Sequence, residues 1–138
     1  MSVQLNAYLS FKDNAREAMQ FYQKTFGGEL KINTFEEYHA SEDPSENDKV
    51  MHALLTTPNG LTLMAADTPK SMEFKTGSNI SMSLSGDDEA QLTDYWQKLT
   101  TKGNVVMPLE KAEWGDTFGM LTDQFGINWM VNISPAKS

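Results

Sequence analysis

The sequence predicts an α+β fold made of two βαβββ modules in tandem, and two observations carry this prediction. The first is a repeated amphipathic helix, because residues 21–24 (Phe-Tyr-Gln-Lys) match residues 95–98 (Tyr-Trp-Gln-Lys) at an offset of 74 positions. The second is the alternation of apolar and polar residues in the segments around each helix. We expect one domain over residues 1–138, with module one at 3–67, a linker at 68–77 and module two at 78–134. A mixed sheet that carries helices on its outer face only leaves the other face free to form a cup.

The first module opens with a predicted strand and a predicted helix. Residues 3–11 alternate, with one apolar face made of Val3, Leu5, Ala7, Leu9 and Phe11. Residues 14–26 instead space their apolar side chains as one stripe of a helix, namely Ala15, Ala18, Met19, Tyr22 and Phe26. Asn14 is expected to cap the first turn of this helix, and the pair Gly27-Gly28 to end it in a left-handed conformation.

The remaining strands and the second module follow the same order. Strands are predicted at 30–38, 50–57 and 61–66, with an acidic polar loop at 39–48 and a tight hairpin turn at Pro58-Asn59-Gly60. The second module then has a strand at 79–85, a helix at 88–102 with an acidic cap, and strands at 105–109, 117–122 and 127–133. Gly60 matches Gly126 at an offset of 66, and the second module is shorter because it lacks the acidic loop.

Composition excludes several classes of function. The net charge is −8 and the pI about 4.6, which argues against nucleic acid and against anionic membrane surfaces as partners. The sequence contains no cysteine, so it has neither disulfides nor thiolate ligands. Residues 1–6 show no signal-peptide pattern, and no apolar run approaches the roughly 20 residues that cross a bilayer. We therefore expect a cytoplasmic protein.

Seven short segments resemble one known family. They are Tyr-Leu-Ser-Phe (8–11), Ala-Met-Gln-Phe-Tyr (18–22), Phe-Gly-Gly (26–28), Val-Met-His-Ala (50–53), Leu-Met-Ala-Ala-Asp (63–67), Trp-Gly-Asp-Thr-Phe-Gly (114–119) and Asp-Gln-Phe-Gly-Ile-Asn-Trp (123–129). In these segments and in its tandem βαβββ pattern the chain resembles the PhnB-like proteins of the vicinal oxygen chelate superfamily. That superfamily includes glyoxalase I, bleomycin- and fosfomycin-resistance proteins and extradiol dioxygenases. The resemblance implies the glyoxalase/bleomycin-resistance fold, whereas one fold of this kind hosts many chemistries.

The resemblance also implies where a metal would bind. Metal-dependent members take ligands from the first and last strands of each module, which correspond here to Asn6, Met64, Asn79 and Met130. None of these is His, Glu or Asp, and hard divalent cations need such ligands. His52 alone would supply one imidazole. We therefore expect no bound metal and no cofactor.

Other residues have both a structural and a functional interpretation. His52 within a strand and His39 at a loop edge are more often structural than catalytic. Glu36 and Glu37 are expected on opposite faces of a strand, hence at a solvated edge. Trp129 is expected in the core, and Met120 joins the methionines that would give a binding surface an adaptable lining. The predicted ligand-binding residues are Asn6, Tyr8, His52, Met64, Asn79, Trp114, Phe118 and Met130.

Three functions stay open at this stage. The first is binding of a small, partly hydrophobic molecule in the cup, without a metal. The second is an enzyme of lyase, transferase or dioxygenase type that uses His52, Tyr8 or Asp116 as acid or base. The third is a structural or regulatory partner with a vestigial cup. The sequence has no glycine-rich turn typical of S-adenosylmethionine binding in doubly wound folds. The superfamily's habit of pairing modules also predicts a homodimer.

Overall fold

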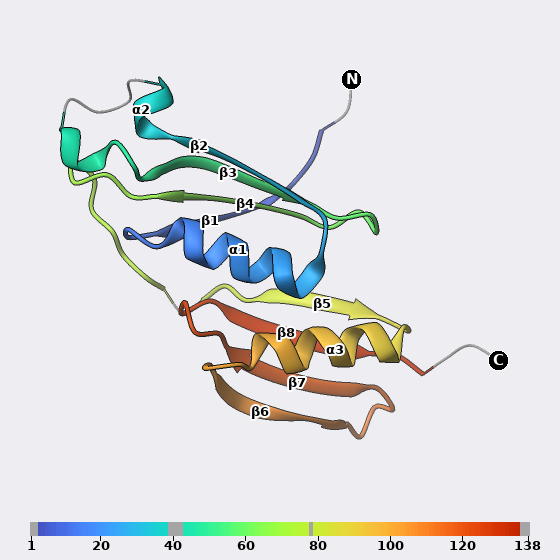
Figure 1. Cartoon of the computed structure of the whole chain (residues 1–138). Coiled ribbons are helices and arrows are strands. Elements are labelled where there is room, and N and C mark those ends of the chain that lie inside the picture. Colours follow the sequence, from blue (N-terminus) through green and yellow to red (C-terminus); the bar gives the residue numbers. More distant parts are fainter. Residues whose placement is uncertain (1–2, 39–42, 78, 136–138) are drawn as a thin grey trace. The chain divides into compact units, whose positions relative to one another are not determined.

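Each half of the chain forms a four-stranded sheet against one long helix (Figure 1). The computed structural model describes residues 3–38, 43–77 and 79–135. The chain divides into two units, Met1–Thr76 and Gly77–Ser138, and each has its own internal contacts. The predicted α+β class with two βαβββ modules is confirmed. The joining of the two sheets into one cup stays a prediction.

The first unit has the strand order β1-β4-β3-β2. Strands β1 and β4 are parallel and the other neighbours are antiparallel, so the sheet is mixed. Its elements are β1 (Ala7–Phe11), α1 (Ala15–Phe26), β2 (Glu29–Thr34), α2 (Phe35–Tyr38), the 3-10 turn η1 (Pro44–Glu46), β3 (Val50–Thr56) and β4 (Thr62–Asp67).

The second unit repeats this plan with the order β5-β8-β7-β6. Its elements are β5 (Met82–Gly86), α3 (Glu89–Leu99), β6 (Asn104–Lys111), β7 (Thr117–Thr122) and β8 (Asn128–Ile133). The repeat extends to single residues, since Ala53 faces Ala65 in the first sheet and Gly119 faces Val131 in the second, both at the offset of 66. The two hairpins therefore have the same register.

The core of each unit lies between the helix and one face of its sheet. The predicted stripe of α1 is buried throughout, and so are the four predicted stripe residues of α3. On the sheets, the buried side chains alternate with half-buried or exposed ones along β4, β7 and β8. Trp129 is fully buried, as expected. Burial of these apolar side chains is the main stabilising term at roughly 25 cal/mol per Å².

The helix ends differ from the expectation in one respect. Asn14 makes no side-chain cap hydrogen bond. Instead, the Asp67 carboxylate at the end of β4 accepts a hydrogen bond of 2.9 Å from the backbone N–H of Ala15. The acidic cap of α3 is confirmed, because Asp88 accepts from the backbone N–H of Gln91 at 3.0 Å. Gly27 has φ of 79°, which confirms the left-handed end of α1.

Two strands begin later than predicted. The first begins at Ala7 rather than residue 3, and Val3 and Leu5 are exposed. The register explains this, because Ala7 faces Leu63 and Leu5 would fall beyond the start of β4. Strand β5 likewise begins at Met82 instead of residue 79 and leaves Ile80 exposed, because residue 79 would face the turn before β8. Apolar alternation thus overestimated both strands.

The second strand ends earlier than predicted. It stops at Thr34 after a bulge, and Phe35–Tyr38 form a one-turn helix. The buried Phe35 donates its backbone N–H to the carbonyl of Lys49 at 3.0 Å, which holds this turn against the start of β3. The prediction that Glu36 and Glu37 lie on opposite faces of a strand is therefore wrong. His39 lies outside the described residues.

Helix α3 requires a glycine on the strand beneath it. A Cβ atom built on Gly119 would lie 2.7 Å from Trp96 Cη2 and 2.9 Å from Leu109 Cα. The positions that match Gly119 and Trp96 in the first unit hold Ala53 and Tyr22. The second unit thus has a larger aromatic residue on its helix and a glycine, in place of alanine, on the strand beneath it.

No helix in the described part of the chain is long and apolar enough to cross a membrane.

Candidate functional site

The sheet face turned away from the long helix, here called the distal face, carries most of the predicted site residues. Side chains that face each other across paired strands point to the same side of a sheet. In the first sheet, one row across the distal face is therefore Tyr8, Met64, Leu54 and Lys31. The next row contains Ser10, Ala66, His52 and Asn33. The structure thus brings together three predicted residues, Tyr8, His52 and Met64.

Tyr8 and His52 form a pair on this face. The Tyr8 hydroxyl lies 3.2 Å from His52 Nδ1, and the two ring centroids are 5.8 Å apart. Tyr8 reaches His52 across β4, where the small Ala66 leaves room between them. Tyr8 is 51% exposed, while partial burial raises its pKa above the usual 10.0. At neutral pH the phenol therefore keeps its proton and can donate a hydrogen bond to His52 Nδ1.

Polar groups border the pair on one side. Asn33 faces His52 across the strands and donates its side-chain amide to Glu37 at 3.2 Å. Lys31 faces Leu54 in the neighbouring row and gives the face a cation. Half-buried Leu54 and Met64 supply its apolar part. The first distal face consequently combines hydrogen-bonding groups with a small apolar patch.

The second distal face is richer in sulfur and aromatic groups. Met130 faces Ser83 on one side and Met120 on the other, and Met120 faces Met107. The next row holds Ser85, Asn132, Phe118 and Glu110. Met130 occupies the position that Met64 has in the first unit, at the offset of 66. Both units therefore place a half-buried thioether at the same point of the sheet.

Trp114 contacts this second face from the hairpin between β6 and β7. Its ring centroid lies 5.8 Å from that of Phe118 at an interplanar angle of 62°, an edge-to-face contact. The Asp116 carboxylate accepts a hydrogen bond of 3.0 Å from Asn132 on β8, which fixes the hairpin to the sheet. The predicted residues Trp114, Phe118 and Met130 thus belong to one face.

Two predicted site residues lie outside the strands that form these faces. Asn6 precedes β1 and Asn79 precedes β5. The residues that face Met64 and Met130 on the neighbouring strands are instead Tyr8 and Ser83. A ligand role for Asn6 and Asn79 stays a prediction.

Potential metal ligands are sparse in the described part of the chain. No group of three or more His, Cys, Asp or Glu side chains there lies close enough together to hold a metal ion. On the two faces, His52 is bonded to a phenol, and Met64 and Met130 are thioethers, which suit soft metals rather than Mg²⁺, Mn²⁺ or Zn²⁺. Among the described residues, Glu110 and Asp116 are the carboxylates at the second face, and together with these residues they form no group of three or more ligands of the kind that the superfamily's divalent cation needs.

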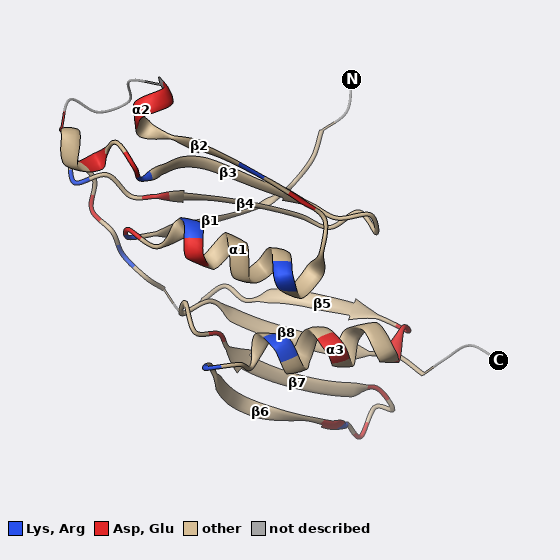
Figure 2. Cartoon of the chain, in the orientation of Figure 1, with Lys and Arg blue, Asp and Glu red and all other residues tan. Residues whose placement is uncertain are grey.

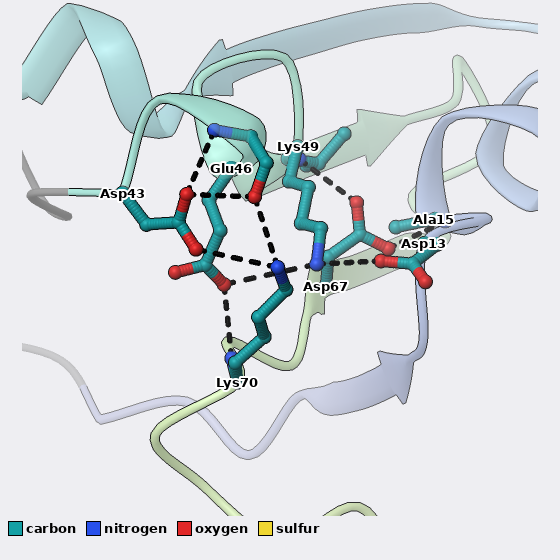
Figure 3. Close-up of polar contacts among 9 residues, drawn as sticks. Asp13, Ala15, Asp43, Glu46, Lys49, Asp67 and Lys70 are labelled. Carbon is teal, nitrogen blue, oxygen red and sulfur yellow. Dashed lines mark hydrogen bonds and ion pairs between the residues drawn. The ribbon is translucent and has the colours of Figure 1, made fainter.

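A second polar cluster lies at the start of α1 and stabilises the first unit (Figure 3). Asp67 is 4% exposed, and its two oxygens accept from the backbone N–H groups of Ala15 and Val50, each at 2.9 Å. Lys49 Nζ lies 2.7 Å from Asp13 and 3.7 Å from the buried Glu46. Asp67 therefore joins β4 to the first residues of α1 and of β3.

The same cluster holds the residues that follow β4. Glu46 accepts from the backbone N–H of Lys70 at 2.9 Å, and Lys70 Nζ donates to Ser45 Oγ at 3.0 Å and lies 3.3 Å from Asp43. A cavity of about 510 Å³ opens beside these groups and also contacts Arg16. Because the acids and bases here pair with one another, we interpret the cluster as structural.

The ion pairs shift the pKa values of their members. The hydrogen bond from Lys49 lowers the pKa of Asp13 below 3.8, and the same contact raises the pKa of Lys49 above 10.5. Hydrogen bonds from Ser45 lower the pKa of Asp43. Each shift favours the charged form that the folded unit uses.

Sequence reasoning missed several residues of these sites. Asp67 follows Leu63 and Ala65 at period two, so a charge at a core position was a visible signal of a buried structural acid. Glu110 and Asn132 had no such signal. Their place beside Phe118 depends on strand registers that include two bulges in β6.

Comparison with known proteins places the chain in a family. A family model described as 3-demethylubiquinone-9 3-methyltransferase matches residues 4–132. The chain is similar to Protein YjdN of Escherichia coli, with 27% identity over 140 residues that cover 94% of each chain. It is also similar to an uncharacterized protein, Mb0911c, of Mycobacterium bovis, with 28% identity that covers 85% of this chain and 74% of the other.

Solved structures agree with the fold. Protein PA1353 from Pseudomonas aeruginosa has a TM-score of 0.82 at 35% identity, and the match covers 98% of this chain and all of that one. A PhnB protein from Bacillus cereus, titled a putative 3-demethylubiquinone-9 3-methyltransferase, has a TM-score of 0.74 at 24% identity over 96% of this chain and 100% of its own. A glyoxylase/bleomycin resistance protein/dioxygenase domain from Frankia has a TM-score of 0.66 at 12% identity and covers 100% of this chain and 96% of its own. The glyoxalase/bleomycin-resistance fold is confirmed.

Proposed function

The chain belongs to the 3-demethylubiquinone-9 3-methyltransferase family, whose members include PhnB-like proteins of the glyoxalase fold, and we propose that it binds a small, partly hydrophobic molecule on the distal faces of its sheets. The single observation that carries the proposal is the repeated placement of Met64 and Met130, each half-buried at the same register position. A thioether adapts its shape to aromatic and alkyl groups and contacts them favourably. The pairs Tyr8–His52 and Trp114–Phe118 border these thioethers and add polar and aromatic contacts.

Binding is proposed to occur without a divalent cation. The residues beside the two methionines are Tyr8 and Ser83, and neither is a preferred ligand of Mg²⁺ or Zn²⁺. Elemental analysis of protein purified without chelator should find well below one equivalent of Zn, Mn, Fe, Co or Ni. A stoichiometric metal that survives dialysis and is lost in His52→Ala would contradict the proposal.

Fluorescence of the neutral apolar probe N-phenyl-1-naphthylamine tests binding itself. We expect the wild-type chain to enhance the probe's emission, and Met64→Lys or Met130→Lys to reduce its affinity because each places a charge on a distal face. Gln20→Lys adds the same charge on the exposed side of α1 and serves as the control. Absence of enhancement in the wild type, or equal binding by all four proteins, would exclude the distal faces as the binding surface.

Catalysis is the second candidate, because one observation favours it. The 3.2 Å contact between the Tyr8 hydroxyl and His52 Nδ1 is an acid–base pair within reach of a bound molecule. Once a ligand is known, its turnover by wild type, Tyr8→Phe and His52→Ala should be compared by mass spectrometry. Turnover that both variants retain would assign the pair to binding alone. The methyltransferase in the family description is a property we do not extend to this chain.

A second copy of the chain is the proposed protein partner. A two-fold interface uses the same surface on both copies. The edge strand β6 exposes Val105, Val106 and Met107, which gives such an interface apolar area. Light scattering after gel filtration should give about twice the chain mass of 15.5 kDa at micromolar concentration. A mass of a single chain would contradict the dimer.

A further inference from the structure

The hairpin between β6 and β7 holds an aromatic side chain in water beside the second distal face. Trp114 is 66% exposed, although exposure of an indole forfeits the free energy that its burial would release. The hairpin is fixed by backbone hydrogen bonds from Ala112 N–H to the Asp116 carbonyl at 2.7 Å and from Gly115 N–H to the Ala112 carbonyl at 3.0 Å. Gly115 has φ of 103°, a conformation that favours glycine. These contacts fix the backbone that carries Trp114, and the edge-to-face contact with Phe118 holds its indole beside the sheet.

The groups around the aromatic pair are acidic. Glu110 faces Phe118 directly across the strands, so the two side chains leave the same face of the sheet as neighbours. On the other side of Phe118, Asn132 is bonded to the Asp116 carboxylate. Phe118 is thus flanked by a carboxylate on one side and by a bonded carboxylate on the other.

Cations are missing from this face. Strands β5, β7 and β8 carry no charged residue along their described lengths (Figure 2). Lys111 on β6 faces Thr117, which in turn faces the buried Ile133, so Lys111 belongs to the opposite side of the sheet. Within residues 79–135, the registers place no Lys or Arg on the distal face. The charged side chains beside Trp114 and Phe118 on this face are therefore acidic ones, Glu110 and Asp116.

We propose that the second distal face binds an organic cation, a protonated or quaternary amine, at Trp114, Phe118 and Glu110. An ammonium group is attracted to the faces of aromatic rings, most strongly to an indole, and a carboxylate nearby adds charge complementarity. Met120 and Met130 in the adjoining row receive the apolar part of the ligand. This inference rests on the proposed function and specifies the ligand class for one of the two faces.

The first distal face differs in charge. It carries Lys31 in the row of Met64, and its aromatic side chain, Tyr8, is bonded to His52. A second cation there would face like-charge repulsion from Lys31. Glu37 is bonded to Asn33 at the edge of that face, and Glu29 lies at its far end opposite Thr56. The cation site therefore belongs to the second unit.

A pair of probes that differ in one atom tests the proposal. Choline carries a quaternary nitrogen where 3,3-dimethylbutan-1-ol carries a neutral carbon of the same shape. Binding is followed through the indole N–H signal of Trp114 in ¹⁵N–¹H spectra of the full chain, assigned by its disappearance in Trp114→Phe. We expect choline to shift this signal with an affinity about two- to fivefold higher than the alcohol, the range of an exposed cation–π contact.

Variants separate the contributions of ring and charge. Trp114→Ala should abolish choline-dependent shifts at the Phe118 amide, whereas Trp114→Phe, which keeps a ring, should retain part of them. Glu110→Gln should weaken choline binding and leave the alcohol unchanged. Glu29→Gln, the same change on the exposed edge strand of the other unit, should leave both probes unchanged.

The outcomes distinguish this inference from the broader function. Equal affinity for choline and the alcohol, or insensitivity to Glu110→Gln, would overturn the cation site. If N-phenyl-1-naphthylamine still binds the distal faces in that case, the proposed function stands without it. If none of the three probes binds, both fail.

Discussion

Each unit of the chain buries one aspartate, but the two acids connect very different stretches of backbone. Asp67 accepts from Ala15 and Val50, which are 52 and 17 residues away in the sequence. Asp123 accepts from the backbone N–H groups of Phe125 and Ile127 and from the Trp129 indole at 2.8 Å, all within six residues. The position that matches Asp67 in the second unit is the buried Ile133.

This comparison shows that two units with the same backbone arrangement can use different residues where their strands, helices and loops are connected. The first unit carries an extra loop between β2 and β3, and Asp67 ties the end of that loop to the sheet and to α1. The second unit connects β6 and β7 with a shorter segment than the one between β2 and β3, so an apolar residue suffices at the same point. Two of the three groups that Asp123 holds are the N–H groups of its own turn. Long-range and local acids should therefore respond differently to the same substitution.

The largest expected effect comes from Asp67→Asn. An amide has one acceptor oxygen, so either Ala15 or Val50 loses its partner and meets an N–H group instead. We expect the free energy of unfolding to fall by about 2–4 kcal/mol in urea titrations, from one lost charge-assisted hydrogen bond and one unsatisfied buried donor. Faster hydrogen exchange should appear at both Ala15 and Val50.

Asp123→Asn is the matched control for this prediction. Its amide oxygen can keep Phe125 and Ile127, so only the bond to Trp129 Nε1 is lost, and faster exchange should stay within residues 123–129. If Asp123→Asn instead disturbs amides across its whole unit while Asp67→Asn does not, the distinction between local and long-range acids is wrong.

A second prediction concerns the contact between the long helix and the strand beneath it, which pairs a large aromatic residue with a small residue in each unit. Gly119→Ala places a Cβ against Trp96 and Leu109, and such overpacking should cost about 1–3 kcal/mol of unfolding free energy. Adding Trp96→Tyr recreates the first unit's combination of Tyr22 and Ala53 and should recover part of the loss. The recovery is only partial because the contact with the Leu109 backbone remains.

Thermal unfolding of the two single variants and the double variant measures this coupling. Ala53→Gly is the control in the first unit, where it should cost about 1 kcal/mol or less because it creates no clash. If the changes in unfolding free energy of Gly119→Ala and Trp96→Tyr are additive, the glycine is not needed to make room for the indole.

The fold could be read from the sequence largely because its signals are local. The apolar stripes of α1 and α3 and the turns before Leu61 and Ile127 need only a few residues each, and they gave the repeat. The strand starts could not be read because Val3 and Leu5 continue the alternation to positions that would face residues before Thr62, where β4 begins. Where a strand ends depends on its neighbour as well as on its own sequence.

The site was predictable in part for the same reason. Strand alternation set Tyr8 on the face opposite Ala7 and Leu9, and the family resemblance supplied Met64 and Met130. The partners of these residues required registers between strands, so Ser83 was not anticipated beside Met130. Parity also failed for Glu36 and Glu37, because the buried Phe35 turns the chain into a helix at that point.

The smallest expected effect concerns the ion pair in the first unit, which has no counterpart at the start of α3 among the described salt bridges. Asp13→Asn should lower the unfolding free energy by up to about 1 kcal/mol at pH 7, since the Asp13 side chain is more than half exposed. The lowered pKa of Asp13 means that its contribution is present above pH 3.8 and disappears as the pH falls through the folded value below 3.8.

The raised pKa of Lys49 sets the upper end of the range. Its contribution is present below pH 10.5 and is lost as the pH rises through the higher folded value. Urea unfolding of wild type and Asp13→Asn should therefore differ between these limits and converge in acid, once the pH has fallen below the lowered pKa of Asp13. A difference that persists unchanged in strong acid would exclude the ion pair as its cause.

The two hairpin tips have a consequence for recombining the halves of the chain. Thr57 N–H donates to Leu61 at 3.1 Å and Asp123 N–H to Ile127 at 2.9 Å, and in both turns the glycine three residues on donates back to the first residue. The two tips therefore have the same backbone hydrogen bonds, but the two possible grafts differ in the side-chain contacts that they remove. A graft of residues 57–61 into the second unit replaces Asp123 with threonine and removes the acceptor of the Trp129 indole. The reverse graft meets Leu63 at the matching position, which demands no such partner. A chimera that carries residues 123–127 in place of residues 57–61 should accordingly be more stable than the chimera with the reverse replacement.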